Sequence, residues 1–178
     1  MIFSFLLAGS LVQGTSVPPN RIVVATSQFL TRQADSWFEA GDFPAAISVL
    51  RYQYSLVPTS EEAVTDLGWM LQNVGRMEEA EALYKKFAID AVGNPDRALP
   101  LAQYYALVAR EPRKVIALLE PLIEEKVHPN NLRLLAKSYE RIEDFKNAVR
   151  IYRILVQRFP EDLTAKRNLE MALRKLEG

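Results

Sequence analysis

A step of 34 residues recurs along the sequence and constrains the fold more than any other feature. Gly41 is followed by Gly75 at this distance, and two further series keep the same step. The first consists of small residues and the second of aromatic residues or leucine: Ala34, Gly68, Ala102 and Ala136, then Trp37, Leu71, Tyr105 and Tyr139. A fixed period of this size predicts a stack of similar units, each of which buries its apolar face against its neighbours.

The residue types within each period predict two helices joined by a short turn. A small residue midway along the first helix lets the second helix approach, and the large residue three positions later lies on the same face. Gly41 and Gly75 fall where the first helix should end, a position that favours a left-handed backbone. Pro58 and Pro160 should end the second helix. Two further sets complete the pattern. Small residues stand early in the second helix, at Ala46, Ala80 and Ala148. Apolar residues are expected to hold the turn against the core, at Phe43, Met77 and Phe145.

These residues resemble the tetratricopeptide repeat family, whose unit is a helix pair of about 34 residues. The resemblance implies an all-α fold, a right-handed α-solenoid of four helix pairs closed by a C-terminal capping helix. The expected pairs are residues 27–60, 61–94, 95–128 and 129–162, and the expected cap is residues 163–178.

The two ends of the array carry further expectations. Residues 17–26 are expected to form a linker and the start of the first helix, near Arg21, with Asn20 as its N-cap. Four leucines of the capping helix are expected to face the stack: Leu163, Leu169, Leu173 and Leu176.

The third unit departs from the pattern. It lacks the turn glycine, and Pro121 lies inside its second helix, which it should kink. Strict spacing puts Lys114 where the other units have alanine. A one-residue insertion before Lys114 would put Val115 there instead, and both registers are open at this point.

Composition limits the chemistry. The 178 residues include 22 basic and 22 acidic side chains, no cysteine, and one histidine, His128, which is expected to be a surface loop residue. Zero net charge argues against a general nucleic-acid binder. No serine–histidine–aspartate set, phosphate loop or metal-spaced cluster can be drawn. We therefore expect no enzyme, no cofactor, no metal and no small-molecule substrate.

The N-terminus, residues 1–16, is apolar from Ile2 to Val12. This run is shorter than the roughly 20 apolar residues of a membrane span, so none is expected. It fits the apolar core of a signal peptide, with Val12 and Gly14 as a cleavage signature, and indicates a bacterial exported protein, periplasmic or secreted. No Lys or Arg precedes the run. The alternatives are a misassigned N-terminus, a segment packed on the first repeat, and a cytoplasmic protein.

The resemblance implies that the first helices line a concave groove, in which a protein or peptide partner would bind. The expected groove residues are Phe38, Trp69, Gln103, Arg133, Lys137 and Arg141. The alternative for Phe38 and Trp69 is that they seal neighbouring repeats. An aromatic anchor beside a basic end predicts a ligand with an apolar residue and an acidic segment.

Some members of the family bind chaperone C-termini through a clamp of Lys, Asn and Arg side chains. The corresponding positions here are Thr31, Asp35, Asp66, Asp96 and Leu101, none of which matches. The resemblance therefore does not extend to that co-chaperone function.

Charge is divided between the two ends of the chain: residues 27–94 hold 5 basic and 10 acidic residues, and residues 129–178 hold 11 and 7. Exposed ion pairs are too weak to hold copies together, so a monomer is expected. The leading hypothesis is a non-catalytic adaptor or assembly factor of the bacterial cell envelope. A cytosolic adaptor is the nearest alternative, and nucleic-acid binding through the basic last helix is a third.

Overall fold

The computed structural model describes residues 19–177, and within them all regular structure is helical. The first helices of the four pairs are α1 (Pro19–Glu39), α3 (Glu61–Asn73), α5 (Leu99–Gln103) with its continuation η1 (Tyr104–Val108), and α7 (Pro129–Arg141). The second helices are α2 (Phe43–Leu56), α4 (Met77–Asp90), α6 (Pro112–Leu119) with η2 (Glu120–Leu122), and α8 (Phe145–Arg158). The last helix is α9 (Leu163–Glu177).

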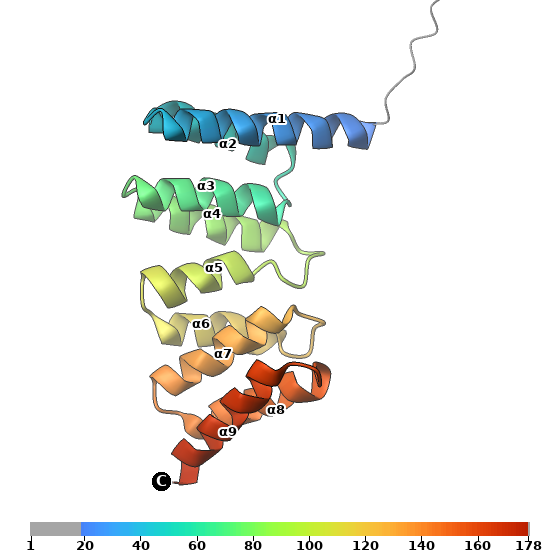
Figure 1. The fold of residues 1–178 in the computed structure, drawn as a ribbon, viewed down its shortest axis with the longest axis vertical. Helices are drawn as coiled ribbons and strands as arrows, with labels where there is room; N and C mark the ends of the chain where they lie inside the picture. Colours follow the sequence, from blue (N-terminus) through green and yellow to red (C-terminus); the bar gives the residue numbers. More distant parts are fainter. Residues whose placement is uncertain (1–18, 178) are drawn as a thin grey trace, which may run out of the picture.

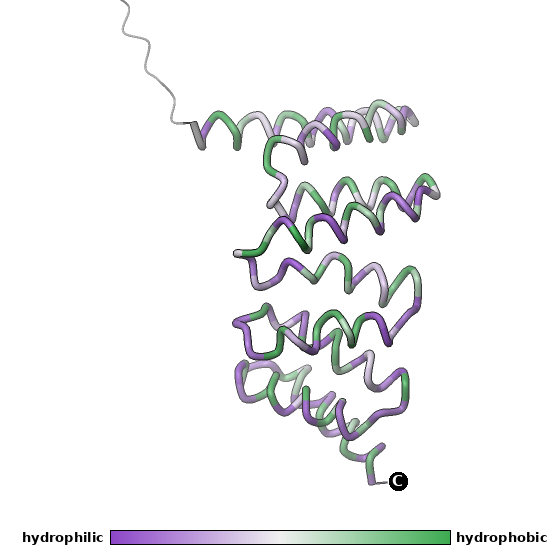
Figure 2. The backbone as a smooth tube through the Cα atoms, turned by 180° about the vertical axis from the view of Figure 1, so that it is seen from behind, coloured by the Kyte–Doolittle hydropathy of each residue, from purple (hydrophilic) through white to green (hydrophobic). Residues whose placement is uncertain are grey.

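The helices form a single stack, from α1 at one end to α9 at the other (Figure 1). Helices that are consecutive in the chain pack against each other, and apolar and polar residues interleave along each of them (Figure 2). The all-α solenoid expected from the sequence is confirmed. No helix within the described residues is long and apolar enough to cross a membrane.

The turns between paired helices use a left-handed residue in every unit. Gly41 and Gly75 have φ angles of +76° and +77°, as their positions predict. The third and fourth units place Arg110 and Glu143 in the same region, with φ angles of 56° and 60°. The turn geometry is thus retained where the glycine is not, at a cost in backbone strain.

The third unit contains the one-residue insertion. Its first helix ends in η1, a π-helical turn, which accommodates one more residue than an α-helical turn. The insertion puts Val115, at 0% exposure, where the other units bury alanine, and leaves Lys114 exposed. Pro121 was expected to kink the second helix from within, but α6 already ends at Leu119 and Pro121 lies in the 3-10 turn η2 that follows it.

Two expectations at the ends of the array are wrong. Asn20 is not an N-cap, because α1 begins at Pro19 and Asn20 lies within it. Leu163 and Leu176 do not face the stack and are exposed. The buried face of α9 is made by Ala165 and Ala172, with Leu169 and Leu173 packed beside them, since only this side of the helix meets the core.

Candidate partner-binding surface

Two of the expected groove residues meet on neighbouring first helices. Phe38 of α1 and Trp69 of α3 have their ring centroids 5.4 Å apart, and Phe43 packs edge-on against Phe38 at 5.6 Å. These three side chains are called the aromatic cluster below. Trp69 is 50% exposed, whereas Phe38 is partly buried against the core. Phe43 and Met77, which were expected to hold the turns against the core, are themselves more than one third exposed.

The exposure of Trp69 follows from its register on α3. Leu71 occupies the packing position of the second unit and is almost fully buried. Trp69 stands two residues earlier, about 200° away around the helix, so it cannot share that buried face. Trp69 is therefore a surface residue whose ring packs against the ring of Phe38.

The three expected basic groove residues are all engaged within the chain. Arg133 forms an ion pair with Asp162 and donates to Asn130 Oδ1 at 2.7 Å. Lys137 pairs with Glu140 at 2.9 Å. Arg141 donates from Nη1 to the carbonyl oxygen of Ala106 at 2.6 Å. Gln103, the remaining predicted residue, is half-buried on α5.

In contrast to these basic residues, the acidic side chains beside the aromatic cluster are not paired with opposite charges in the described part of the chain. Asp35 on α1, and Glu62 and Asp66 on α3, have no ion-pair partner within residues 19–177. We call these three the acidic cluster. Burial raises the pKa of Asp66 above its ordinary value, and the carboxylates of Glu62 and Asp35 raise it further. The side chain of Asp66 therefore lies within electrostatic reach of both Glu62 on its own helix and Asp35 on α1.

In the sequence, Asp35 and Asp66 correspond to positions of the chaperone clamp, which they do not match, and no member of the acidic cluster is in the predicted set of groove residues. Asp35 precedes Phe38 by three residues, and Asp66 precedes Trp69 by the same distance. Residues three apart on a helix are neighbours on its surface, so this spacing was the signal available in the sequence.

A pocket of about 450 Å³ adjoins the acidic cluster where α1, the end of α2 and the start of α3 meet. Gln53 is a buried residue of its lining and donates from Nε2 to Ser27 Oγ at 2.9 Å and to Thr31 Oγ1 at 3.1 Å. Its lining includes apolar, polar and charged side chains: Val23, Val24, Gln28, Arg32, Val57 and Glu62.

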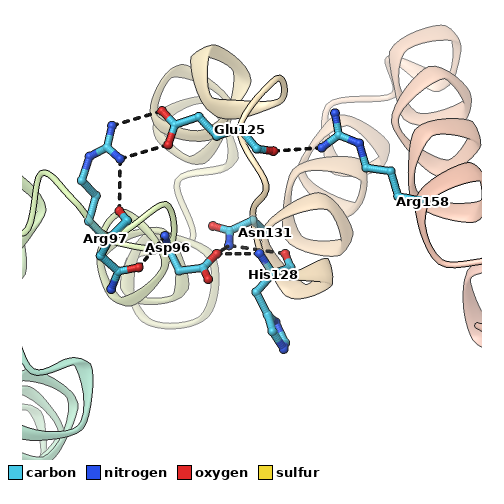
Figure 3. Close-up of polar contacts among 7 residues, drawn as sticks. Asp96, Arg97, Glu125, His128, Asn131 and Arg158 are labelled. Carbon is cyan, nitrogen blue, oxygen red and sulfur yellow. Dashed lines mark hydrogen bonds and ion pairs between the residues drawn. The ribbon is translucent and has the colours of Figure 1, made fainter.

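A second polar region lies at the loop edge of the stack (Figure 3). Asp96 Oδ1 accepts hydrogen bonds from the backbone nitrogen of His128 and from Asn131 Nδ2, both at 2.6 Å. Arg97 pairs with Glu125 at 3.1 Å, and Arg158 donates to the Glu125 carbonyl oxygen at 3.0 Å. These contacts join the loops before α5 and α7 to the end of α8, so they brace the stack.

His128 has a local structural role in this region. Its side chain is exposed, and its Nδ1 accepts a hydrogen bond from the backbone nitrogen of Asn130 at 3.2 Å. This contact caps the first turn of α7.

The described residues contain no group of three or more histidine and carboxylate side chains placed to hold a metal ion. The aromatic and acidic clusters offer apolar contact, hydrogen bonding and charge pairing.

The sequence of the fourth helix pair matches the family model described as tetratricopeptide repeat, over residues 132–162. No curated protein matches the chain. Among solved structures, a crystal structure of MamA protein superposes with a TM-score of 0.62 and 19% identity, covering 85% of this chain and 83% of that one. A second crystal structure of MamA has a TM-score of 0.60 and 20% identity, covering 79% and 82%.

The MamA RS-1 ArsTM double mutant is similar to the same degree, with a TM-score of 0.59 and 15% identity over 84% of this chain and 85% of that one. At these identities the likeness concerns the fold. The chain therefore contains a segment matching the tetratricopeptide repeat at residues 132–162, within a helical-repeat fold like that of MamA.

Proposed function

We propose that this protein is a non-catalytic scaffold for protein–protein interaction, which binds a segment of its partner across the first helices. The observation that supports this function most directly is Trp69, half-exposed on the surface and packed against Phe38. Tryptophan is enriched among the residues that contribute most to binding energy at protein interfaces. The helical-repeat fold supplies an extended surface of the kind that such arrays use to bind partners.

The proposal is tested by comparing partner capture by the wild type, Trp69→Ala and a matched control. Tyr52→Ala serves as control because Tyr52 is 56% exposed but lies on α2, a second helix. Both variants should keep the wild-type circular dichroism, since both side chains are half in solvent. Proteins that are retained by the wild type and by Tyr52→Ala should not be retained by Trp69→Ala. The expected loss of binding free energy is about 2 kcal/mol or more, as for other hot-spot residues.

If Trp69→Ala retains the same proteins as the wild type, the partner does not bind at the aromatic cluster. Should Trp69→Ala unfold, Trp69→Phe, which keeps an aromatic ring against Phe38, replaces it. Binding that is unchanged in a folded Trp69→Phe and also in a folded Phe38→Ala would contradict the proposal in the same way.

We further propose that the scaffold works in the bacterial cell envelope, after export. The support is the apolar run from Ile2 to Val12, with Val12 and Gly14 as the cleavage signature at its end, all of which lies outside the described residues. Cell fractionation with N-terminal sequencing of the native protein tests this location. An intact Met1 in the cytosol would favour the cytosolic adaptor instead.

We also propose that the isolated protein is a monomer. Its acidic and basic ends offer only screened, exposed ion pairs between copies. Light scattering over a salt series should give the monomer mass throughout. An oligomer that persists at about 0.5 M salt, where the Debye length falls to a few ångströms, would contradict this proposal.

A further inference from the structure

The negative charge of residues 27–94 is unevenly distributed between first and second helices. Four of the five basic residues in this range are already paired, each with an acid on α4: Arg51 and Arg76 with Glu79, Lys85 with Glu81, and Lys86 with Asp90. The fifth, Arg32, lies on α1 and lines the pocket beside Glu62. These pairs therefore place four of the basic residues at α4, whereas α3 carries Glu61, Glu62 and Asp66 and has no basic residue of its own.

The acidic cluster and the aromatic cluster form one surface. Asp35 and Phe38 are neighbours on α1, Asp66 and Trp69 are neighbours on α3, and the rings of Phe38 and Trp69 join the two helices at 5.4 Å. Glu62 extends this surface to the pocket of about 450 Å³. None of the three carboxylates forms an ion pair within residues 19–177. Burial raises the pKa of Asp66, and the neighbouring carboxylates of Glu62 and Asp35 raise it further.

We infer that the segment recognised by this surface carries an arginine or lysine next to an apolar side chain, an inference that rests on the proposed scaffold function. The cation would pair with Asp35 and Asp66 while lying against the face of Trp69, because a half-exposed indole attracts cations as well as apolar groups. The apolar neighbour would pack on the aromatic cluster or enter the pocket lined by Val23 and Val24.

The charge of this ligand is opposite to the charge expected from the sequence. An acidic ligand would need Arg133, Lys137 and Arg141 to be available. Each of them instead holds an internal partner: Asp162, Glu140 and the carbonyl of Ala106. An acidic segment at Trp69 would also meet the carboxylate of Asp66, and like charges in contact oppose binding.

Selection from random peptides displayed on phage tests the inference without knowledge of the native partner. Peptides of about 12 residues span up to about 40 Å when extended, enough to cross several first helices. The full-length protein is the target, and parallel selections use Trp69→Ala and the double variant Asp35→Asn/Asp66→Asn. Peptides enriched on the wild type should contain Lys or Arg adjacent to Leu, Ile, Val or Phe, and the variants should not enrich them.

The affinity of the most enriched peptide is then measured by titration at low and high salt. Asp35→Asn/Asp66→Asn should weaken binding by about three- to tenfold, because it removes two charge pairs and each pair at a surface contributes modestly to affinity. The control is Glu78→Gln, which removes one negative charge from α4, where Glu78 is exposed in the first turn. This control should leave the affinity unchanged, and added salt should weaken wild-type binding.

The outcomes separate this inference from the function on which it rests. Enrichment of acidic or uncharged peptides that depends on Trp69 would overturn the inference and leave the scaffold function standing. The inference would also be overturned if Glu78→Gln lowered the affinity of basic peptides as much as Asp35→Asn/Asp66→Asn does. The peptides would then respond to the overall negative charge and not to the acidic cluster. A folded target that enriches no peptide would count against both.

Discussion

The ring of Tyr84 lies directly over the backbone of Gly68. A methyl group on Gly68 would come within 2.2 Å of the Tyr84 ring and hydroxyl, a separation that no packed pair of atoms adopts. The tyrosine is held there because its hydroxyl accepts a hydrogen bond from Gln72 Nε2 at 2.8 Å, and that amide also donates to the Gly68 carbonyl at 3.1 Å. This contact gives a physical reason for a small residue at this repeat position.

Gly68→Ala should therefore destabilise the protein by overpacking, at a cost of about 1–3 kcal/mol in the free energy of unfolding. Urea unfolding followed by circular dichroism measures the change. Gly93→Ala is the matched control, because a methyl group at Gly93 would meet nothing within 4 Å. Equal stability of the two variants would mean that α3 and α4 lie farther apart than described.

Glu143→Gly should stabilise the protein by about 1 kcal/mol, because glycine removes the clash that a left-handed backbone imposes on other residues. Glu143 has a φ angle of 60° at the turn of the fourth unit. The reciprocal change, Gly41→Ala, should cost a similar amount, since φ is +76° there and the surrounding space is open. Thermal unfolding of both variants checks the prediction, and shifts of the same sign would contradict it.

Deleting Leu107 should leave the fold intact. Leu107 lies exposed within the π-helical turn η1, which holds the extra residue of the third unit, so its loss should convert that turn to α-helix. The stability change should stay within about 1 kcal/mol. Deleting Asn73, which lies 34 positions earlier and is the last residue of α3, shortens a regular α-helix and rotates the turn that follows it by about 100°. Cooperative unfolding should survive the first deletion only.

Asp66→Asn should raise the stability of the free protein at neutral pH. The pKa of Asp66 is raised above 3.8 in the folded state, so folding favours its protonated form and ionisation opposes folding. This destabilising contribution is absent below pH 3.8, grows as the pH rises to the raised pKa, and is constant above it. The stability difference between variant and wild type should follow that course in urea titrations. A gain that does not fade at low pH would contradict the electrostatic cause.

The same substitution should weaken binding of the basic peptides while it stabilises the fold. A loss of affinity together with a gain in stability is typical of a residue kept for function, because functional sites retain unfavourable local interactions. A purely structural role for Asp66 would produce a loss of stability instead.

The helix pairs could be predicted from the sequence because their requirements are local. Gly41 and Gly75 mark turns that need a left-handed residue, and Ala46 and Ala80 mark helix crossings that leave no room for a larger side chain. Even the insertion in the third unit could be stated as an alternative, since Val115 fits a buried position and Lys114 does not. Its location in η1 could not be predicted, because a π-helical turn has no residue signature of its own.

The state of the candidate site was decided by tertiary structure. Arg133 and Asp162 are 29 positions apart, and Arg141 and Ala106 are 35 apart, so only the stacking of units brings each pair together. The sequence alone determined the period, the helix pairs and the unequal charge of the two ends. The tertiary structure decided which charged side chains remain available to a partner. A side chain that stacking brings next to an opposite charge is paired within the chain, and this proximity cannot be read from its position in the sequence.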